Sequence, residues 1–331
     1  MSYSEALVAL SGGGDSALAL HLTAEAGLRV RAACVDMGEG VPEEARAVAE
    51  LAGVQLLEVD GSDRFRRQVA DPIRRMLSAG LTPNPCALCN PGPKLGLLNS
   101  LLNPQEVLVT GHYAFAGPEG LRRGLDRNKD QSYFLSLVPP GVLRNCMMPL
   151  GAWTKRAARA KVAELGLPSR QRESMDLCFD PSSGIERPSW TVVDRTGSTL
   201  CEDLGPLLPT IGQRLRLPGR AARLYVYRMD PAGGILHAGP RELLEARGCL
   251  LSGVNDLGMP DAPTFRGTVQ IRYRKDPEPC LVSRRARGLL VRFDRQLESV
   301  APGQVGAVAI GSRLVAGGTI ERALKGGDLE H

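Results

Sequence analysis

The stretch Ala6-Leu-Val-Ala-Leu-Ser11-Gly-Gly-Gly-Asp15-Ser16-Ala-Leu-Ala-Leu20 decides the fold prediction. An apolar run is followed by a glycine-rich turn, and an apolar segment with helical periodicity comes next. Three adjacent glycines let the backbone approach a ligand where a Cβ atom would collide with it. The helix that follows presents unpaired N–H groups and the positive end of its dipole, which favour an anion. The pattern therefore predicts a phosphate-binding turn after the first strand of an open α/β sheet.

This turn differs from the P-loop of kinases and ATPases, because no Lys-Ser or Lys-Thr pair follows its glycines. Ser-Gly-Gly-x-Asp-Ser instead resembles the pyrophosphate loop of N-type ATP pyrophosphatases. Those enzymes cleave ATP between the α and β phosphates and adenylate an oxygen of their substrate. An ordinary glycine-rich β–α turn is the alternative interpretation, and the order of strand, turn and helix favours the functional one.

The chain has 331 residues, which is enough for two or three domains with a sizeable core. It has no apolar run of membrane-spanning length and no basic-then-apolar pattern at its N-terminus, so we expect a cytoplasmic protein with no membrane partner. Residues 1–150 carry a net charge of −2 and residues 151–331 one of +7. Arginine suits phosphate recognition, but solvated surface arginines explain the excess equally well.

The pattern of strands and helices predicts an α/β fold with a doubly wound parallel sheet. Strand-like runs alternate with helical patterns, which places ligands at the carboxyl ends of the strands. The expected strands cover residues 6–10, 28–35, 54–59 and 106–110, and the expected helices cover 17–26, 42–52, 64–79 and 154–165. From about residue 185, short β-like runs broken by Gly and Pro predict small β-rich barrels or sandwiches, and we expect the last domain to be a β-barrel. The expected domains are 1–184, 185–262 and 263–331.

The second informative stretch is Thr82-Pro-Asn-Pro-Cys86-Ala-Leu-Cys89-Asn90. Its two prolines disfavour helix and predict a rigid loop over residues 82–93. A C-x-x-C pair in such a loop is typical of a redox pair, half a zinc site or an Fe–S anchor, and inert buried thiols are the alternative. Cys178 is the other strongly placed cysteine, whereas the remaining five are expected to pack in the core.

Together these segments resemble the tRNA-specific 2-thiouridylases, which replace oxygen by sulfur at C2 of the anticodon wobble uridine. The resemblance is collinear over almost the whole chain. Beside the two stretches above it includes Thr110-Gly-His-Tyr-Ala114, Arg123-Gly-Leu-Asp-Arg-Asn-Lys-Asp-Gln-Ser-Tyr-Phe134, Thr154-Lys155, Cys178-Phe179, Thr210-Ile-Gly-Gln-Arg214, Ile271-Arg-Tyr-Arg274 and Pro302-Gly-Gln304.

The resemblance implies a set of site residues. ATP would be held by Gly111, by Met37 near the adenine, and by Ala9, Leu10, Ser11, Gly12, Gly13, Gly14, Asp15 and Ser16. Mg²⁺ is expected on its phosphates. Cys89 matches the nucleophile, Cys178 the cysteine that carries the persulfide, and Asp15 is grouped with them as catalytic. The residues that match tRNA contacts are Asn84, Pro85, Cys86, His112, Lys129, Asp130, Gln131, Arg272, Tyr273 and Gln304. The expected partners are tRNA and a protein that donates persulfide or sulfide.

The sequence departs from the family in ways that keep alternatives open. Cys86 stands where many members carry Asp, so Cys86, Cys89 and Cys178 form an alternative set of ligands for a [4Fe–4S] cluster. The segment between residues 37 and 82, and the one over residues 179–208, are shorter than expected. One alternative function is therefore a pyrophosphatase-loop enzyme that acts on another substrate, as a small-molecule sulfur transferase or an amidating synthetase. The other is a degenerate paralogue that binds RNA or nucleotide.

Overall fold

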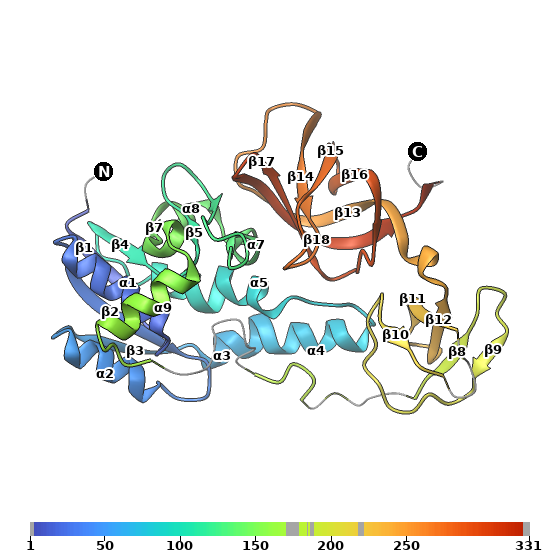
Figure 1. Cartoon of the computed structure of the whole chain (residues 1–331), viewed down its shortest axis with the longest axis horizontal. Helices are drawn as coiled ribbons and strands as arrows, with labels where there is room; N and C mark the ends of the chain where they lie inside the picture. The colour runs from blue at the N-terminus through green and yellow to red at the C-terminus, as the bar shows by residue number, and fades with distance from the viewer. Residues whose placement is uncertain (1–2, 170–178, 184, 186–188, 218–221, 327–331) are drawn as a thin grey trace.

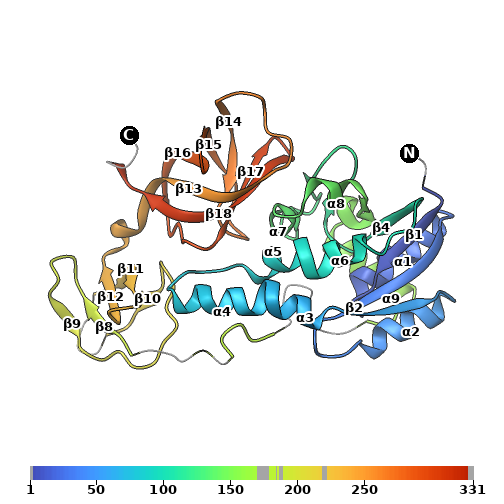
Figure 2. The ribbon, with the colours of Figure 1, turned by 180° about the vertical axis from the view of Figure 1, so that it is seen from behind.

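In the computed structural model, the chain forms an N-terminal α/β part, a small β-rich middle part and a C-terminal β-barrel (Figure 1). The structure describes residues 3–169, 179–183, 185, 189–217 and 222–326. Opposite views agree that the middle part lies at the end of helix α4 (Asp71–Ser78) remote from the N-terminal sheet (Figure 2). The predicted fold class is confirmed.

Five parallel strands make the sheet of the α/β part, in the order β3-β2-β1-β4-β7. Their bounds are Leu56–Asp60, Arg29–Asp36, Glu5–Ala9, Glu106–Val109 and Cys146–Met147. The strand order reverses between β1 and β4, and ligands of such sheets bind outside the carboxyl ends of the strands at that point. The glycine turn follows β1, so the fold brings it to the expected binding edge.

Three regular helices support this edge, namely α1 (Gly14–Glu25), α2 (Glu43–Leu51) and α9 (Lys155–Glu164). Helices were expected at these three places, and a side-chain cap marks the start of α9. Thr154 Oγ1 accepts a hydrogen bond from Ala157 N at 3.2 Å, as a helix N-cap does. Within the described ranges, no helix is long and apolar enough to cross a membrane.

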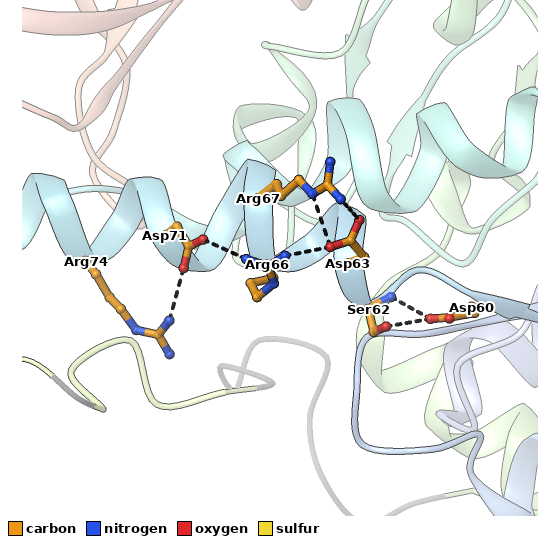
Figure 3. A network of polar contacts seen from close by, with 7 residues as sticks. All are labelled: Asp60, Ser62, Asp63, Arg66, Arg67, Asp71 and Arg74. Carbon is orange, nitrogen blue, oxygen red and sulfur yellow. Dashed lines mark hydrogen bonds and ion pairs between the residues drawn. The ribbon is translucent and has the colours of Figure 1, made fainter.

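The helix expected over residues 64–79 is present but irregular. It consists of α3 (Ser62–Phe65), a π-helical turn η1 (Arg66–Ala70) and α4, one after the other. A ladder of ion pairs runs along its exposed side, where Asp63 pairs with Arg66 and Arg67, and Asp71 pairs with Arg66 and Arg74 (Figure 3). Because exposed ion pairs contribute little to stability, buried Phe65, Val69 and Ile73 on the opposite side hold this helix in place.

The rigid loop expected over residues 82–93 is wrong from residue 85 onward. Helix α5 (Pro85–Cys89) continues through a π-helical turn η2 (Asn90–Lys94) into α6 (Leu95–Asn99). Asn84 is the N-cap, since its Oδ1 accepts from Ala87 N at 3.0 Å. Pro85 occupies the first helical turn, where a missing N–H costs nothing. Pro85 therefore marks the start of the helix, and Pro91 and Pro93 fall in its π-helical turn.

The middle part is a curled mixed sheet in the order β10-β11-β12-β8-β9, whose β12–β8 pair is parallel. Trp190, Val226 and Leu236 belong to its small core. In the order of the sheet, the strands are Arg214–Leu215, Leu224–Asp230, Ile235–Gly239, Thr191–Val193 and Thr199–Cys201.

The remaining short elements of the described residues are β5 (Ala114–Phe115), β6 (Arg122–Arg123), α7 (Ser132–Leu135), α8 (Pro140–Arg144), η3 (Pro149–Ala152) and η4 (Arg241–Leu244).

The C-terminal barrel has six antiparallel strands and closes where β13 pairs with β18. Its strands are β13 (Glu245–Asp256), β14 (Thr264–Gln270), β15 (Glu278–Arg285), β16 (Gly288–Glu298), β17 (Val305–Ile310) and β18 (Arg313–Leu324). The barrel begins with β13 at Glu245, earlier than residue 263, where we expected it to begin. The Gly- and Pro-rich stretch 253–263 overlaps the end of β13 and connects it to β14, so it is a turn within the barrel.

The barrel and the α/β part share one hydrophobic core. Leu135, Leu257 and Leu314 belong to the same buried cluster although they come from both parts. Polar contacts fix the junction, because Asn255 Nδ2 donates to Ser136 O at 2.9 Å and to Val138 O at 2.8 Å. The barrel is therefore held against α7, and its residues take part in shaping whatever site α7 borders.

Gly317→Ala should destabilise the protein, because a Cβ atom at Gly317 of β18 would collide with the carbonyl oxygen of Ser136. Overpacking of this kind costs about 1–3 kcal/mol, so we expect a lower Tm in thermal unfolding. Gly141→Ala is the control, since a Cβ atom there meets no heavy atom within 4 Å. Equal Tm values for the two variants would contradict this close contact between barrel and α/β part.

Candidate active site

A cavity of about 830 Å³ opens at the carboxyl ends of β1, β2 and β4. Fourteen of the predicted site residues line it: Ala9, Leu10, Ser11, Gly13, Gly14, Asp15, Ser16, Met37, Pro85, Cys86, Cys89, Gly111, His112 and Gln131. Seven others that the structure describes do not line it, namely Gly12, Asn84, Lys129, Asp130, Arg272, Tyr273 and Gln304. Cys178 lies outside the described residues. The cavity thus brings the glycine turn and the C-x-x-C pair together.

The glycine turn is closed by its own serines. Ser16 Oγ donates to Gly13 O at 2.8 Å and accepts from Ser11 N at 3.2 Å. Gly12 has φ +76°, which favours glycine, and a Cβ atom there would lie 3.0 Å from Pro42 Cβ. Gly13 then caps α1 without a side chain. Ser16 N donates to Gly13 O at 3.1 Å, and the N–H groups before it make the start of this 12-residue helix a positive end in the cavity wall.

Gly111 explains how closely β4 approaches the start of α1. A Cβ atom at Gly111 would lie 2.7 Å from the carbonyl carbon and oxygen of Asp15 and 2.9 Å from Ser16 N. Any larger residue would have to push the first turn of α1 away from the sheet. The identity of Gly111 is therefore set by packing against the turn.

The carboxylate of Asp15 is held by two donors. Tyr113 Oη donates to its Oδ1 at 2.7 Å, and Lys155 Nζ donates to its Oδ2 at 2.6 Å. Burial, and then the neighbouring Asp15 carboxylate, raise the pKa of Tyr113, so this phenol stays protonated and keeps donating. Asp15 is therefore fixed in the cavity wall with its charge balanced by Lys155.

His112 is buried and neutral. Its Nδ1 lies 2.7 Å from Thr110 Oγ1. Burial lowers the pKa of His112 well below its usual value, and the charge of Lys94 lowers it further. The imidazole thus brings hydrogen-bonding capacity, and no positive charge, to the cavity at neutral pH.

Cys86 and Cys89 lie three residues apart on α5, so both face the same side of the helix. Cys86 packs against the large core, whereas Cys89 packs in a separate apolar cluster around Phe65. Phe179 belongs to that same cluster, with its ring centroid 5.1 Å from that of Phe65 at 89°. Among the described residues, no group of three or more His, Cys, Asp or Glu side chains could hold a metal ion.

The predicted tRNA-contact residues of the barrel lie around α7, next to the cavity. Tyr133 Oη donates to Gln304 Oε1 at 3.2 Å, and the ring centroids of Phe134 and Tyr273 are 4.4 Å apart. Phe134 itself lines the cavity, and Asn90 Nδ2 donates to its carbonyl oxygen at 3.2 Å. The barrel thus reaches the rim of the site through α7.

Asp130 and Gln131 have structural partners. Asp130 Oδ1 accepts from Gly124 N at 3.0 Å and from Ser132 N at 3.1 Å, which shapes the loop before α7. Gln131 Oε1 accepts from Tyr113 N at 3.0 Å, and Gln131 N donates to Tyr113 O at 2.9 Å. Gln131 therefore holds the segment that carries Tyr113 to Asp15, whereas Asp130 holds the loop before α7.

Sequence reasoning assigned no role to several residues that line the cavity: Lys94, Phe134, Lys155, Arg159 and Phe179. Phe134, Lys155 and Phe179 stand in stretches that match the family, and Lys155 and Arg159 form a basic pair one turn apart after Thr154, which could have marked them. The contact of Lys155 with Asp15, 140 residues away in sequence, leaves no local mark in the chain.

Cys86 and Cys89 should react with iodoacetamide at pH 8 before Cys146 and Cys280 do. Burial raises the pKa of Cys146 and of Cys280 to about 12, so few of these thiols are ionised at pH 8, and the thiolate is the reactive form. Peptide mass spectrometry after brief labelling measures the order, with the guanidinium-unfolded chain as control. Labelling of Cys146 as fast as Cys89 would refute this assignment.

Comparison with known proteins places these features in a family. Residues 4–182 match the family model described as "tRNA methyl transferase HUP domain", and residues 249–320 match the "Aminomethyltransferase beta-barrel domain". The first match covers the part of the chain that carries the cavity, and the second match covers strands of the barrel.

Full-length relatives agree with the domain matches. The chain is 35% identical to the tRNA-specific 2-thiouridylase MnmA of Synechococcus sp., over 96% of this chain and 97% of that protein. It is 36% identical to MnmA of Chloroflexus aurantiacus, over 96% and 98% of the two chains. It is 33% identical to MnmA of Thermus thermophilus, over 96% and 95%. With this coverage, and with the glycine turn and the cysteine pair in one cavity, the chain belongs to the tRNA-specific 2-thiouridylase family.

Proposed function

We propose that this protein cleaves ATP between the α and β phosphates, adenylates the C2 oxygen of the wobble uridine of tRNA, and replaces that oxygen by sulfur. One observation carries the proposal: the positive start of α1 and the thiols of Cys86 and Cys89 line the same cavity. Phosphate chemistry and sulfur chemistry can therefore meet at one bound base. The names of the full-length relatives support the same activity.

The cavity fits ATP. Its volume of about 830 Å³ lies within the range of small-molecule sites, about 300–1,000 Å³. The glycine turn and the start of α1 offer N–H groups to phosphate oxygens, and Met37 offers an apolar contact to the adenine. Magnesium would bind mainly through the phosphates and water, as it does in many ATP enzymes. The start of α1 would stabilise the charge that builds on the departing pyrophosphate.

Sulfur transfer would use two cysteines. A persulfide on Cys178 supplies its outer sulfur, which bonds to C2 while AMP leaves with the oxygen. The thiolate of Cys89 then attacks the Cys178 sulfur, which releases 2-thiouridine and leaves a disulfide between the two cysteines, to be reduced by an external thiol. Phe179, the next residue after Cys178, packs in the apolar cluster that also holds Cys89, and this supports their meeting.

A [4Fe–4S] cluster is the competing route for sulfur. The described residues offer the thiols of Cys86 and Cys89, and they include no third ligand group for a metal. The cluster therefore depends on Cys178, and no step of the proposed reaction is assigned to it. The packing of Cys86 in the large core and Cys89 in another cluster favours separate roles for the two thiols.

The barrel and α7 would position tRNA at the rim. Phe134 lies between the cavity and Tyr273, so a base that enters the cavity would pass this pair of aromatic rings. An enzyme that acts on a base has to take it out of its stack, and aromatic rings are common partners for such bases. Lys129, Arg272 and Gln304 remain proposed tRNA contacts of this rim.

Cleavage of ATP to AMP and pyrophosphate should depend on tRNA, and Cys89→Ser and Cys178→Ser should each abolish thiolation. The reason is that each cysteine forms or breaks a sulfur–sulfur bond in the proposed route. Mass spectrometry of wobble nucleosides measures thiolation. Cys201→Ser, in the middle part, is the control and should thiolate normally.

The outcomes separate the alternatives. Normal thiolation in either variant of Cys89 or Cys178 would refute the cysteine assignments. ATP cleavage without stimulation by tRNA would indicate a small-molecule substrate, and binding without cleavage would indicate a degenerate paralogue. A brown anaerobic preparation with absorption near 400 nm, about where such clusters absorb, would favour the cluster route.

Gly111→Ala should raise the KM for ATP by about tenfold or more, because the new Cβ atom displaces the first turn of α1 from the sheet. Steady-state measurement of AMP release tests this, with Gly141→Ala as the control that leaves KM unchanged. An unaltered KM in Gly111→Ala would mean that the start of α1 does not hold the phosphates.

A further inference from the structure

Helix α9 presents a basic face to the cavity. Lys155 and Arg159 both line it, as do Val162 and Ala163 further along the helix. Residues four apart share one side of a helix, so Lys155 and Arg159 point the same way. Ala158, on the adjoining face, is buried with Leu18 of α1, which fixes α9 against the helix that starts at the glycine turn.

The ammonium of Lys155 points to Asp15 and uses only part of its hydrogen-bonding capacity there. It lies 2.6 Å from Asp15 Oδ2 and 5.6 Å from the ring centroid of Tyr113, and the side chain is only 16% exposed. An ammonium has three donors, and the contact with Asp15 needs one of them. Lys155 can therefore keep its bond to Asp15 while donating to a ligand in the cavity.

The start of α9 is held by side chains. Asp126 Oδ2 accepts from Lys155 N at 2.9 Å, and Thr154 Oγ1 accepts from Ala157 N at 3.2 Å. These bonds satisfy the N–H groups of Lys155 and Ala157 and fix the backbone from which the Lys155 side chain extends. What α9 offers to the cavity is therefore side-chain charge.

The carboxylate of Asp15 has to be balanced by positive charge if phosphate is to bind nearby. A carboxylate in the first turn of α1 would repel phosphate from the glycine turn unless a cation balanced it. Among the described residues, two carboxylates, Asp15 and Glu39, line the cavity, against the three cations Lys94, Lys155 and Arg159. The excess of positive charge suits a polyphosphate.

We propose that Lys155, with Arg159 one turn further on, binds the β and γ phosphates of ATP and the pyrophosphate that leaves. When the bond from the α phosphorus to the bridging oxygen breaks, its electron pair goes to pyrophosphate, and the ammonium of Lys155 lies where that charge develops. The α phosphorus bonds to the substrate oxygen in the same exchange. This inference rests on the proposed ATP cleavage and is independent of which substrate receives AMP.

Lys155→Met should weaken the binding of inorganic pyrophosphate with Mg²⁺ by about 10- to 100-fold, the range for one hydrogen bond to a charged group. The affinity for AMP should stay unchanged, because AMP lacks the β and γ phosphates. Isothermal titration calorimetry of the full chain without tRNA measures both. Lys155→Arg should keep part of the pyrophosphate affinity. Lys161→Met is the matched control, since Lys161 lies on the same helix and pairs with Glu164 at 2.7 Å.

Measuring the Lys155→Met effect in an Asp15→Asn protein separates phosphate binding by Lys155 from neutralisation of the Asp15 charge. If Lys155 only balanced Asp15, Lys155→Met would have no effect in an Asp15→Asn protein. We expect pyrophosphate affinity to fall in that background too, which a double-mutant cycle measures. Equal pyrophosphate affinity in the wild type and in Lys155→Met, with AMP bound by both, would overturn this inference alone. A wild type that binds neither pyrophosphate nor AMP would overturn the proposed ATP cleavage as well.

Discussion

The contact between Gly111 and the first turn of α1 is the constraint on which the site depends. Two neighbouring parallel strands, β1 and β4, end side by side, and the chain after β4 passes directly beneath the helix that follows β1. Because Gly111 has no Cβ atom, the first turn of α1 packs closely against the sheet edge, and the cavity lies beside that turn. The next two residues of the same segment, His112 and Tyr113, then face the cavity and Asp15 respectively.

From this edge, the site is built outward by segments that are distant in sequence. Asn90 ties the helix that carries the thiols to Phe134 of α7, and Asn255 ties the barrel to the residues just after α7. Since α7 is packed between the thiols and the barrel, the barrel is a structural part of the site. A change in the barrel that moved α7 would thereby alter the cavity wall.

Much of this arrangement was predictable where local chemistry determines it. The glycine turn and the alternation of strands and helices each follow from a few neighbouring residues, and they gave the correct fold class and the glycine-turn part of the cavity lining. The start of α5 was missed because Pro-Asn-Pro was interpreted as a loop, whereas Asn84 caps a helix with Pro85 in its first turn. The pairing of Lys155 with Asp15 is a tertiary contact, and single-sequence patterns carry no information about it.

The polar groups in and around the cavity differ in whether they can change charge near neutral pH. His112 is kept neutral by burial, and Tyr113 is kept protonated, so neither changes charge near neutral pH. The groups that remain to meet an incoming polyphosphate are the cations and the backbone N–H groups at the start of α1. Fixed donors of this kind need no reorganisation when negative charge develops, and Phe134 and Phe179 make part of the surrounding wall apolar. In the proposed reaction, this wall would help to protect the adenylate from hydrolysis until sulfur reaches the base.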